Sequence, residues 1–280
     1  MDDPEPFIDR MAVQHDWSDE RRFARLAATL DHDTSPWPAA VVPPLGHWLC
    51  FLPGERQSLI GADGHPTRTK DGLLPDVGLP RRMWAGSRIS FLQDMPLNAP
   101  IERTSTLMVA VPKSGRSGRM LFVTVEHRIS VAGGDVAIVE EQDIVYREAA
   151  APGGSFVRTA ADPGESDPTL LMVTPDPVML FRYSALTFNA HRIHYDRQYA
   201  RDEEGYPGLV VQGPLIATLM LDHLLQHSKS RVASYSFRAA SPSFAGEPIA
   251  LGFRQVGNET QLRAVGSVGV LMTGTAELKP

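Results

Sequence analysis

The sequence is poor in cysteine: Cys50 is the single one among 280 residues, so an internal disulfide cannot form. No apolar stretch is long enough to cross a bilayer, and the acidic residues 1–6 lack the apolar core of a signal peptide. Basic residues are fewer than acidic ones, and the net charge of −6 argues against non-specific nucleic-acid binding. We therefore expect a cytoplasmic protein without nucleic-acid or membrane partners.

Several motifs are also absent, which narrows the chemistry. The sequence has no G-x-S-x-G elbow, no Walker loop and no dinucleotide-binding fingerprint. Serine hydrolysis and a nucleotide cofactor thus have no support. The composition is nevertheless sufficient for a large core, because hydrophobic residues make up 42% of the chain and charged residues 21%.

Three segments have the features of helices. Residues 19–30 carry apolar side chains at i, i+3, i+4 and i+7, and Ser18 is placed to cap the first turn. Asp176 and Pro177 form a strong start signal for a second helix, which we expect to run to about residue 187. After Gly213, a run that is apolar nearly all round predicts a buried helix.

Most of the remaining regular sequence is typical of strands, with turns at residues 133–135 and 257–258. The expected strands are 104–111, 121–131, 136–146, 170–173, 235–237, 249–256 and 262–272. Residues 43–80 and the linker 151–168 are predicted to be irregular. The chain therefore divides into an N-terminal domain, 1–150, and a C-terminal domain, 169–280.

A faint internal repeat links the two domains. Placing Phe23 on Phe181 aligns two further identical pairs in the same helix context: Ala27 with Ala185, and Thr29 with Thr187. In this register Pro36 falls on His194. Only the second domain would then retain the histidine.

The densest group of polar residues, 189–196, follows the second predicted helix. A histidine such as His194 can move protons near neutral pH. A helix that opens at Gly213 offers unpaired N–H groups, which can hold an oxyanion such as a thioester enolate. Addition of water to an α,β-unsaturated thioester needs this combination. The same residues are equally typical of a polar loop whose histidines only cap helices.

Residues 181–196 and 205–215 resemble the MaoC-like hydratases, and within them the 3-methylfumaryl-CoA (mesaconyl-C4-CoA) hydratase group. Residues 43–48, 61–66 and 79–87 resemble the N-terminal half of that group. The resemblance implies an α+β double hotdog fold, in which two antiparallel sheets each wrap around a helix. It also implies a hydro-lyase for a short enoyl-CoA thioester, with CoA as part of the substrate, no further cofactor and no metal ion.

The wider family has an Asp and a His, five residues apart, that position and activate the water. His194 matches that histidine, whereas Asn189 replaces the aspartate and can only form hydrogen bonds. Gly213 matches the glycine whose amide faces the thioester carbonyl, so these three are the expected catalytic residues. The resemblance suggests the following substrate-binding residues: Tyr183, His191, Arg192, Asp196, Tyr206 and Gln212.

By the same resemblance, the N-terminal domain is a degenerate copy that shapes the acyl pocket. If the acyl group bears a carboxylate, a buried arginine should meet it, and Arg82 and Arg192 are the candidates. His223 and His227 are four apart on a helix but lack the zincin glutamate, so we expect no metal there. We expect residues 113–119 to form a solvated hairpin turn rather than a CoA-phosphate site.

Three other functions share parts of this pattern. A 3-hydroxyacyl-thioester dehydratase of fatty-acid synthesis has a similar motif and would differ in its preferred acyl length. A non-catalytic acyl-CoA-binding protein would account for Asn189, and a thioesterase can use the same fold. Both a monomer and a homodimer are compatible with the sequence, because a double hotdog already pairs its two halves internally.

Overall fold

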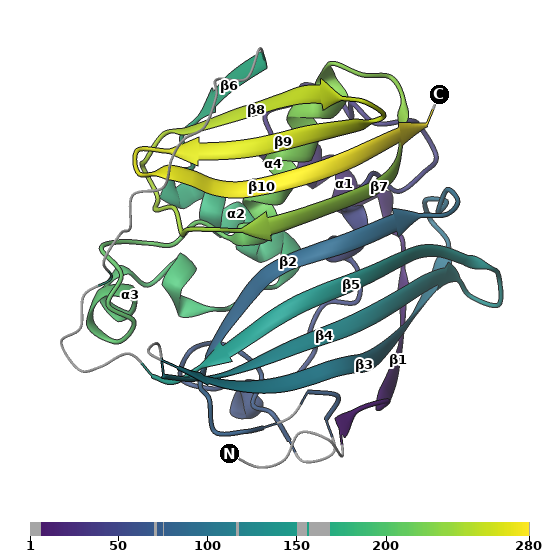
Figure 1. The fold of residues 1–280 in the computed structure, drawn as a ribbon. Coiled ribbons are helices and arrows are strands. Elements are labelled where there is room, and N and C mark those ends of the chain that lie inside the picture. Colours follow the sequence, from purple (N-terminus) through teal and green to yellow (C-terminus); the bar gives the residue numbers. More distant parts are fainter. Residues whose placement is uncertain are drawn as a thin grey trace.

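The computed structural model describes residues 7–69, 72–74, 76–115, 118–149, 156 and 169–279. Ten strands form one antiparallel sheet in the order β1-β3-β4-β5-β2-β7-β10-β9-β8-β6 (Figure 1). The strands are β1 (Met11–Trp17), β2 (Arg81–Phe91), β3 (Pro100–Gly115), β4 (Gly118–Val131), β5 (Val136–Arg147), β6 (Thr169–Val173), β7 (Arg231–Ala239), β8 (Ile249–Val256), β9 (Glu259–Gly266) and β10 (Gly269–Lys279). The helices are α1 (Glu20–Thr29), α2 (Pro177–Thr187), α3 (Arg197–Asp202) and α4 (Gly213–Gln226), and the 3-10 turns are η2 (Gly46–Leu49), η3 (Gln57–Leu59) and η4 (Arg192–His194).

The sheet consists of two halves with one topology. The first half has the order β1-β3-β4-β5-β2, and the second repeats it in mirrored order as β7-β10-β9-β8-β6. The halves meet where β2 pairs with β7, with Gly86 opposite Arg238. The predicted α+β double hotdog fold is therefore confirmed, with its two sheets joined edge to edge. The shared strand order also agrees with the internal repeat.

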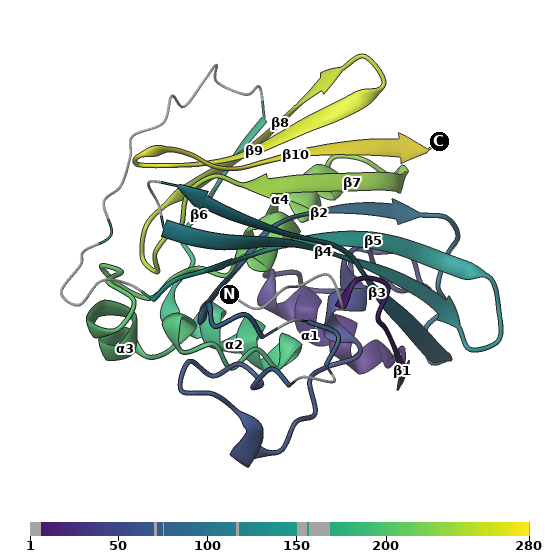
Figure 2. The ribbon, with the colours of Figure 1, turned by 60° about the horizontal axis from the view of Figure 1, so that its bottom comes forward.

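The three longer helices lie on the same face of the sheet (Figures 1 and 2). As predicted, α2 begins at Pro177, and the Asp176 carboxylate accepts a hydrogen bond from the Met179 N–H at 2.8 Å. The prediction of a buried helix after Gly213 is also confirmed, because residues 215–224 of α4 are all buried. These side chains join the main hydrophobic core with the inner residues of β7 to β10.

The cap of α1 differs from the prediction. Asp19, not Ser18, is the N-cap, and its Oδ1 accepts a hydrogen bond from the Arg21 N–H at 3.0 Å. Ser18 is fully buried, and its hydroxyl donates to the Pro96 carbonyl oxygen at 2.8 Å. The hydroxyl is therefore engaged by the loop before β3 and cannot serve the helix.

The N-terminal half also lacks a counterpart of α4 among its described residues. Between α1 and β2 the chain forms only η2 and η3, because prolines such as Pro43 and Pro44 interrupt any helix. The side chains of Leu45 and Leu49 fill the space inside this half of the sheet and are almost completely buried. The helix that the resemblance implied for each half is thus reduced, in this half, to the ten-residue α1.

Strands β1 and β2 and the short helix α3 have no counterpart among the ranges expected from the sequence. The predicted linker, 151–168, lies outside the described residues except for Phe156, so the domain boundaries stay a prediction. Residues 113–115 and 118–119 pair within the β3–β4 hairpin, as expected of a turn, and its tip at 116–117 also lies outside the described residues.

Cys50 is buried, as expected for a small hydrophobic side chain. No helix of the described residues is long and apolar enough to span a membrane.

Candidate active site

His194 lies at the end of η4, in the loop that follows α2. Its Nδ1 is 2.8 Å from the Val210 carbonyl oxygen. A carbonyl only accepts hydrogen bonds, so we infer that Nδ1 carries the hydrogen and Nε2 presents a lone pair. Burial lowers the pKa of His194 to about 4, although the bond to Val210 acts in the opposite direction. Near neutral pH, His194 is therefore a neutral imidazole whose Nε2 can accept a proton.

Val210 connects this histidine to the start of α4. Its N–H donates to the Ile193 carbonyl oxygen at 2.9 Å, while its own carbonyl accepts from His194. Three residues later Gly213 begins α4, and within the described residues its N–H has no acceptor. The free N–H at the positive end of a helix dipole suits an oxyanion. The base and the oxyanion donor are thus held by one short segment.

The protein's own packing does not require a glycine at position 213. A Cβ there would lie 4.0 Å from the nearest atoms, which are the Trp84 carbonyl oxygen and the Met272 terminal methyl carbon. The backbone of Gly213 is also outside the left-handed region that favours glycine. Space is therefore left open where a Cβ on Gly213 would lie, next to the N–H of this residue.

Two amide side chains hold the surrounding loops. Asn189 Oδ1 accepts a hydrogen bond from the His191 N–H at 3.1 Å, so this oxygen is used within its own loop. The amide nitrogen of Gln212 donates to the Leu180 carbonyl oxygen and to Ser184 Oγ, both at 2.9 Å. Gln212 thereby fixes the start of α4 against α2.

A loop from the N-terminal half packs directly on these residues. The Arg192 N–H donates to the Asp63 carbonyl oxygen at 2.8 Å, and Arg192 Nη1 donates to the Ala62 carbonyl oxygen at 3.0 Å. Gly64 has a φ of +93°, and a Cβ there would fall 1.8 Å from the Ala190 carbonyl oxygen. Only glycine permits this backbone and this approach. Residues 61–66 thus form one wall of the site.

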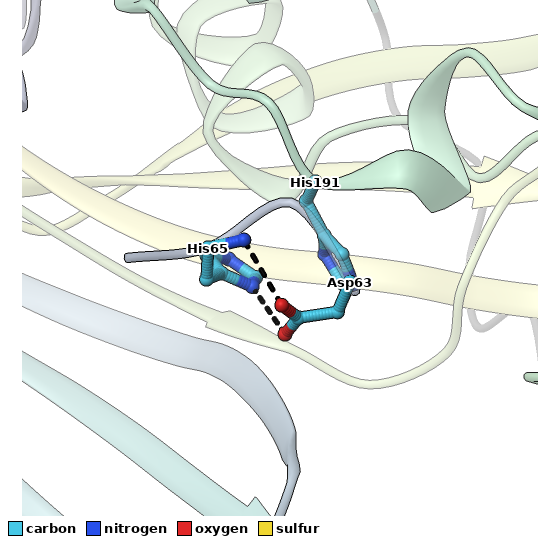
Figure 3. Close-up of side chains that lie close together, drawn as sticks. All are labelled: Asp63, His65 and His191. Atoms are coloured by element: carbon cyan, nitrogen blue, oxygen red, sulfur yellow. Dashed lines mark hydrogen bonds and ion pairs between the residues drawn. The ribbon is translucent and has the colours of Figure 1, made fainter. Parts of the chain in front are cut away.

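This loop brings a carboxylate and a third histidine to the site (Figure 3). His65 Nδ1 lies 2.9 Å from Asp63 Oδ2, and the His65 N–H donates to Asp63 Oδ1 at 3.0 Å. The ring of His191 lies against that of His65, with 4.2 Å between ring centroids, and is edge-on to His194 at 5.4 Å. The three histidines form a row with the Asp63 carboxylate at one end.

Burial and the contacts within the row determine the protonation states of its side chains. Burial opposes ionisation of Asp63, but the hydrogen bond and charge of His65 outweigh it and lower the pKa of Asp63 to about 2. Burial, together with the neighbouring His65 and His194, lowers the pKa of His191 to about 2. Burial also lowers the pKa of His65, against the effect of Asp63. Near neutral pH the row therefore consists of neutral imidazoles beside one carboxylate.

The same three side chains have the composition of a metal site. The donor atoms of Asp63, His65 and His191 lie within 4.8 Å of one another, the only such cluster in the described residues. However, Asp63 and His65 are already hydrogen-bonded to each other. This contact accounts for their positions, so we do not assign a metal to them. His223 and His227 are not part of this cluster.

The remaining predicted residues surround the site or lie beneath it. Asp196 caps α3 and binds Arg192 at 2.7 Å, so the Arg192 guanidinium is occupied. Tyr206 packs on Phe244, with ring centroids 6.0 Å apart. Tyr183 is 1% exposed in the hydrophobic core, and its hydroxyl is 3.4 Å from Thr218 Oγ1. Their assignment to substrate binding stays a prediction.

Arg82, the other candidate for a substrate carboxylate, is placed differently. It lies on β2, half-buried, two residues before Trp84. Its positive charge acts on both His65 and His191 by lowering their pKa values, so it is close to the histidine row. Within the described part of the chain, its guanidinium has no hydrogen bond or ion pair. Among the described residues, Arg82 is therefore a cation without a partner, close to the histidine row.

Sequence reasoning missed Asp63 and His65 as site residues. Residues 61–66 contributed to the resemblance, but the N-terminal half was expected only to shape the acyl pocket. The available signal was local: a glycine between an aspartate and a histidine, at a position where a turn can bring both side chains to one point. Nothing in the sequence indicates that this turn meets residues 189–192.

Comparison with known proteins finds matches along most of the chain. Residues 45–245, more than half of the chain, match the family model "hydroxyacyl-thioester dehydratase type 2". A mesaconyl-C(4)-CoA hydratase from Chloroflexus aurantiacus is 44% identical over 254 residues, which cover 90% of this chain and 89% of the relative. At this identity and coverage the similarity extends to both halves.

Two solved structures show the same fold at low sequence identity. A MaoC-like dehydratase from Phytophthora capsici superimposes with a TM-score of 0.73 at 12% identity, covering 99% of both chains. A Mycobacterium tuberculosis protein described as having a double hotdog fold superimposes with a TM-score of 0.59 at 9% identity, covering 97% of this chain and 96% of its own.

Proposed function

Since this chain belongs to the hydroxyacyl-thioester dehydratase type 2 family, we propose that it is a hydro-lyase that adds water to, or removes it from, the double bond of a short enoyl-CoA thioester. One observation carries the proposal. His194 Nδ1 is fixed on the Val210 carbonyl, which leaves Nε2 as a base, and Gly213 opens α4 three residues after Val210. A base and an oxyanion donor are thus held in one rigid unit.

In this proposal His194 Nε2 takes a proton from water as the water oxygen bonds to C3 of the substrate. The electron pair of the C2–C3 double bond moves into the thioester, and the Gly213 N–H holds the enolate oxygen that forms. The imidazolium then returns its proton to C2, which completes hydration. Dehydration follows the reverse path.

We further propose mesaconyl-C4-CoA as the substrate, supported by the relative of that name at 44% identity. Its acyl group carries a free carboxylate, which requires a cation in the acyl pocket. Of the two arginines suggested by the sequence, Arg192 is engaged by Asp196 and Ala62, whereas Arg82 is unpaired among the described residues. We therefore propose that Arg82 meets the substrate carboxylate.

The match to the dehydratase family model also supports a second candidate, a 3-hydroxyacyl-thioester dehydratase. Turnover of mesaconyl-C4-CoA, crotonyl-CoA and longer 2-enoyl-CoA thioesters, followed by loss of the enoyl-thioester absorbance, distinguishes the two. Preference for mesaconyl-C4-CoA supports the leading proposal, and a preference that rises with chain length supports the second. Release of free thiol would reveal a thioesterase, and binding without turnover a non-catalytic acyl-CoA-binding protein.

The remaining features are also proposals. We place the protein in the cytoplasm, with CoA thioesters as its small-molecule partners and no further cofactor. Either a monomer or a homodimer is compatible with the fold, because β2 and β7 already join the two halves within one chain. Sedimentation of the purified protein would decide between them.

A further inference from the structure

The reaction proposed above needs a second polar group at the water, and the C-terminal motif does not provide one. Asn189 stands where the resemblance places an aspartate of the wider MaoC-like hydratases, and its Oδ1 already accepts the His191 N–H. An amide oxygen so engaged, on a side chain that cannot take a proton, is a poor substitute for a carboxylate. The structure supplies a different candidate from the other half of the chain.

We propose that the attacking water is held between His194 and His65, and that Asp63 fixes His65 in the tautomer that this requires. The proposal rests on the function proposed above. His65 would then be a catalytic residue, because it contacts the water, and Asp63 a positioning residue. The N-terminal half would thereby contribute directly to the chemistry.

Hydrogen bonding gives the first argument. The Asp63 carboxylate can only accept, so the 2.9 Å contact requires the hydrogen to be on His65 Nδ1. His65 Nε2 then presents a lone pair that can accept a hydrogen bond, and so does Nε2 of His194. A water with two acceptors directs both hydrogens to them and keeps an oxygen lone pair for C3. The same Asp–His arrangement orients the histidine of a serine-protease triad.

The position of the loop gives the second argument. His65 lies against His191, which in turn lies edge-on to His194, so the three rings share one wall of the site. The side chains of His65 and Asp63 remain 21% and 27% exposed, so water can reach them, whereas His194 is buried. The close contact between Gly64 and Ala190 holds the loop in place.

The proton balance is unchanged by this addition. His194 takes one hydrogen of the water as a proton and later gives it to C2. The other hydrogen stays on the oxygen and becomes the product hydroxyl, after pointing to His65 Nε2 during the attack. His65 itself remains neutral throughout.

The test uses the full-length chain, with kcat and KM for hydration of mesaconyl-C4-CoA and crotonyl-CoA. We expect His65→Gln and Asp63→Asn each to lower kcat at least about tenfold with KM nearly unchanged, because the water and not the thioester loses its partner. Asp63→Glu should retain more activity than Asp63→Asn, since a carboxylate preserves the tautomer. The control is His15→Gln, which removes an exposed histidine that also faces an acid, Glu102 at 3.5 Å, outside the site; it should leave kcat unchanged.

Folding and ligand binding are checked by thermal unfolding and by calorimetric titration with the saturated butyryl-CoA. A loss of kcat with intact folding and butyryl-CoA binding supports the proposal. Unchanged kcat in His65→Gln, or a change confined to KM, overturns it. Loss of wild-type activity on chelation, restored by Zn²⁺, also overturns it and assigns the cluster to a metal. If the wild type turns over neither substrate, the proposed function itself fails, which is a separate result.

Discussion

The two halves of the molecule share a strand order and differ in what their sheets enclose. In the C-terminal half the sheet encloses α4, whose first turn and preceding segment carry Gly213 and the Val210 contact to His194. In the N-terminal half it covers the shorter α1, irregular chain and a buried polar network around Glu140. The irregular chain between α1 and β2 includes residues 61–66, which carry Asp63 and His65 to the C-terminal part of the site.

The polar network of the N-terminal half surrounds the buried carboxylate of Glu140. Glu140 is 1% exposed and accepts hydrogen bonds from His47 at 3.0 Å, Ser87 at 2.8 Å and Trp48 at 3.1 Å. Burial alone would raise the pKa of Glu140, but these partners, His47 first, lower it to about 2. The N-terminal half therefore places a buried carboxylate in its interior, where its hydrogen bonds compensate for the loss of water.

Removing the buried carboxylate should have the largest effect on the N-terminal half. We expect Glu140→Ala to reduce the free energy of unfolding by about 3–5 kcal/mol, because His47, Trp48 and Ser87 lose their shared acceptor. Urea unfolding measures this. Glu141→Ala, on the next position of β5, removes only a surface ion pair with Arg88 and should cost less than about 1 kcal/mol. Equal costs for both variants would show that the network is not needed.

Acid should destabilise both halves through buried histidines. Burial lowers the pKa of His194 in one half and of His127 in the other to about 4, from 6.5 in the unfolded chain. Between pH 6.5 and about 4 the unfolded chain binds protons that the native state does not, so stability falls as pH falls. Each histidine contributes about 3 kcal/mol across that window.

Urea unfolding at pH 7.5, 6 and 5 measures this loss, and replacing either histidine by Gln should flatten the pH dependence. If the halves contribute equally, His127→Gln and His194→Gln should flatten it to a similar extent. Stability that is constant between pH 7 and 5 would contradict the burial of these rings as neutral groups. A flattening in only one variant would assign the acid sensitivity to that half.

The division of catalytic roles predicts a large asymmetry between the positions aligned by the repeat. His194→Ala should lower kcat for hydration at least about a hundredfold, because it removes the base that is fixed on Val210. Pro36, which the repeat aligns with it, is exposed, and Pro36→Ala should leave kcat within about twofold. Comparable losses in both variants would refute the assignment of the base to the C-terminal half.

The sequence was sufficient for the features that depend on local signals. Asp176 and Pro177 mark the start of α2, and the apolar run after Gly213 marks α4, because capping and continuous hydrophobicity are short-range properties. It was insufficient for β1, an edge strand whose Met11 and Val13 are more than half exposed, so it lacks the alternation that identifies a buried strand.

The contribution of the Asp63–His65 loop to the site was invisible for a different reason. It depends on contacts between residues more than a hundred positions apart, such as Ala62 with Arg192. A single sequence contains no signal of such pairing, whereas His194, Asn189 and Gly213 lie in one continuous motif. The C-terminal half of the site could therefore be predicted from the sequence, and the part contributed by the N-terminal half could not.

The open space at Gly213 offers a smaller and more local test of the C-terminal half. Gly213→Ala should fold normally, because a Cβ there meets no atom closer than 4.0 Å, but should lower kcat/KM by about tenfold or more by crowding the thioester oxygen. Gly208→Ala is the control, since a Cβ at that position meets nothing within 4 Å and is not at the helix start. Equal kcat/KM values for the two variants would remove Gly213 from the oxyanion site.

The last expected effect is of similar size, concerns the acyl pocket and returns to the N-terminal half. If Arg82 meets the substrate carboxylate, Arg82→Gln should lower kcat/KM for mesaconyl-C4-CoA about tenfold or more, since a charge-assisted hydrogen bond contributes about 1.5–3 kcal/mol. Crotonyl-CoA, which lacks the carboxylate, should be hydrated at a nearly unchanged rate. Arg88→Gln, on the same strand but paired with Glu141 and Asp143 at the surface, should change neither. An equal loss of kcat/KM for both substrates in Arg82→Gln would mean that Arg82 acts on the histidine row and not on the acyl group. The N-terminal half would then affect the base without selecting the substrate.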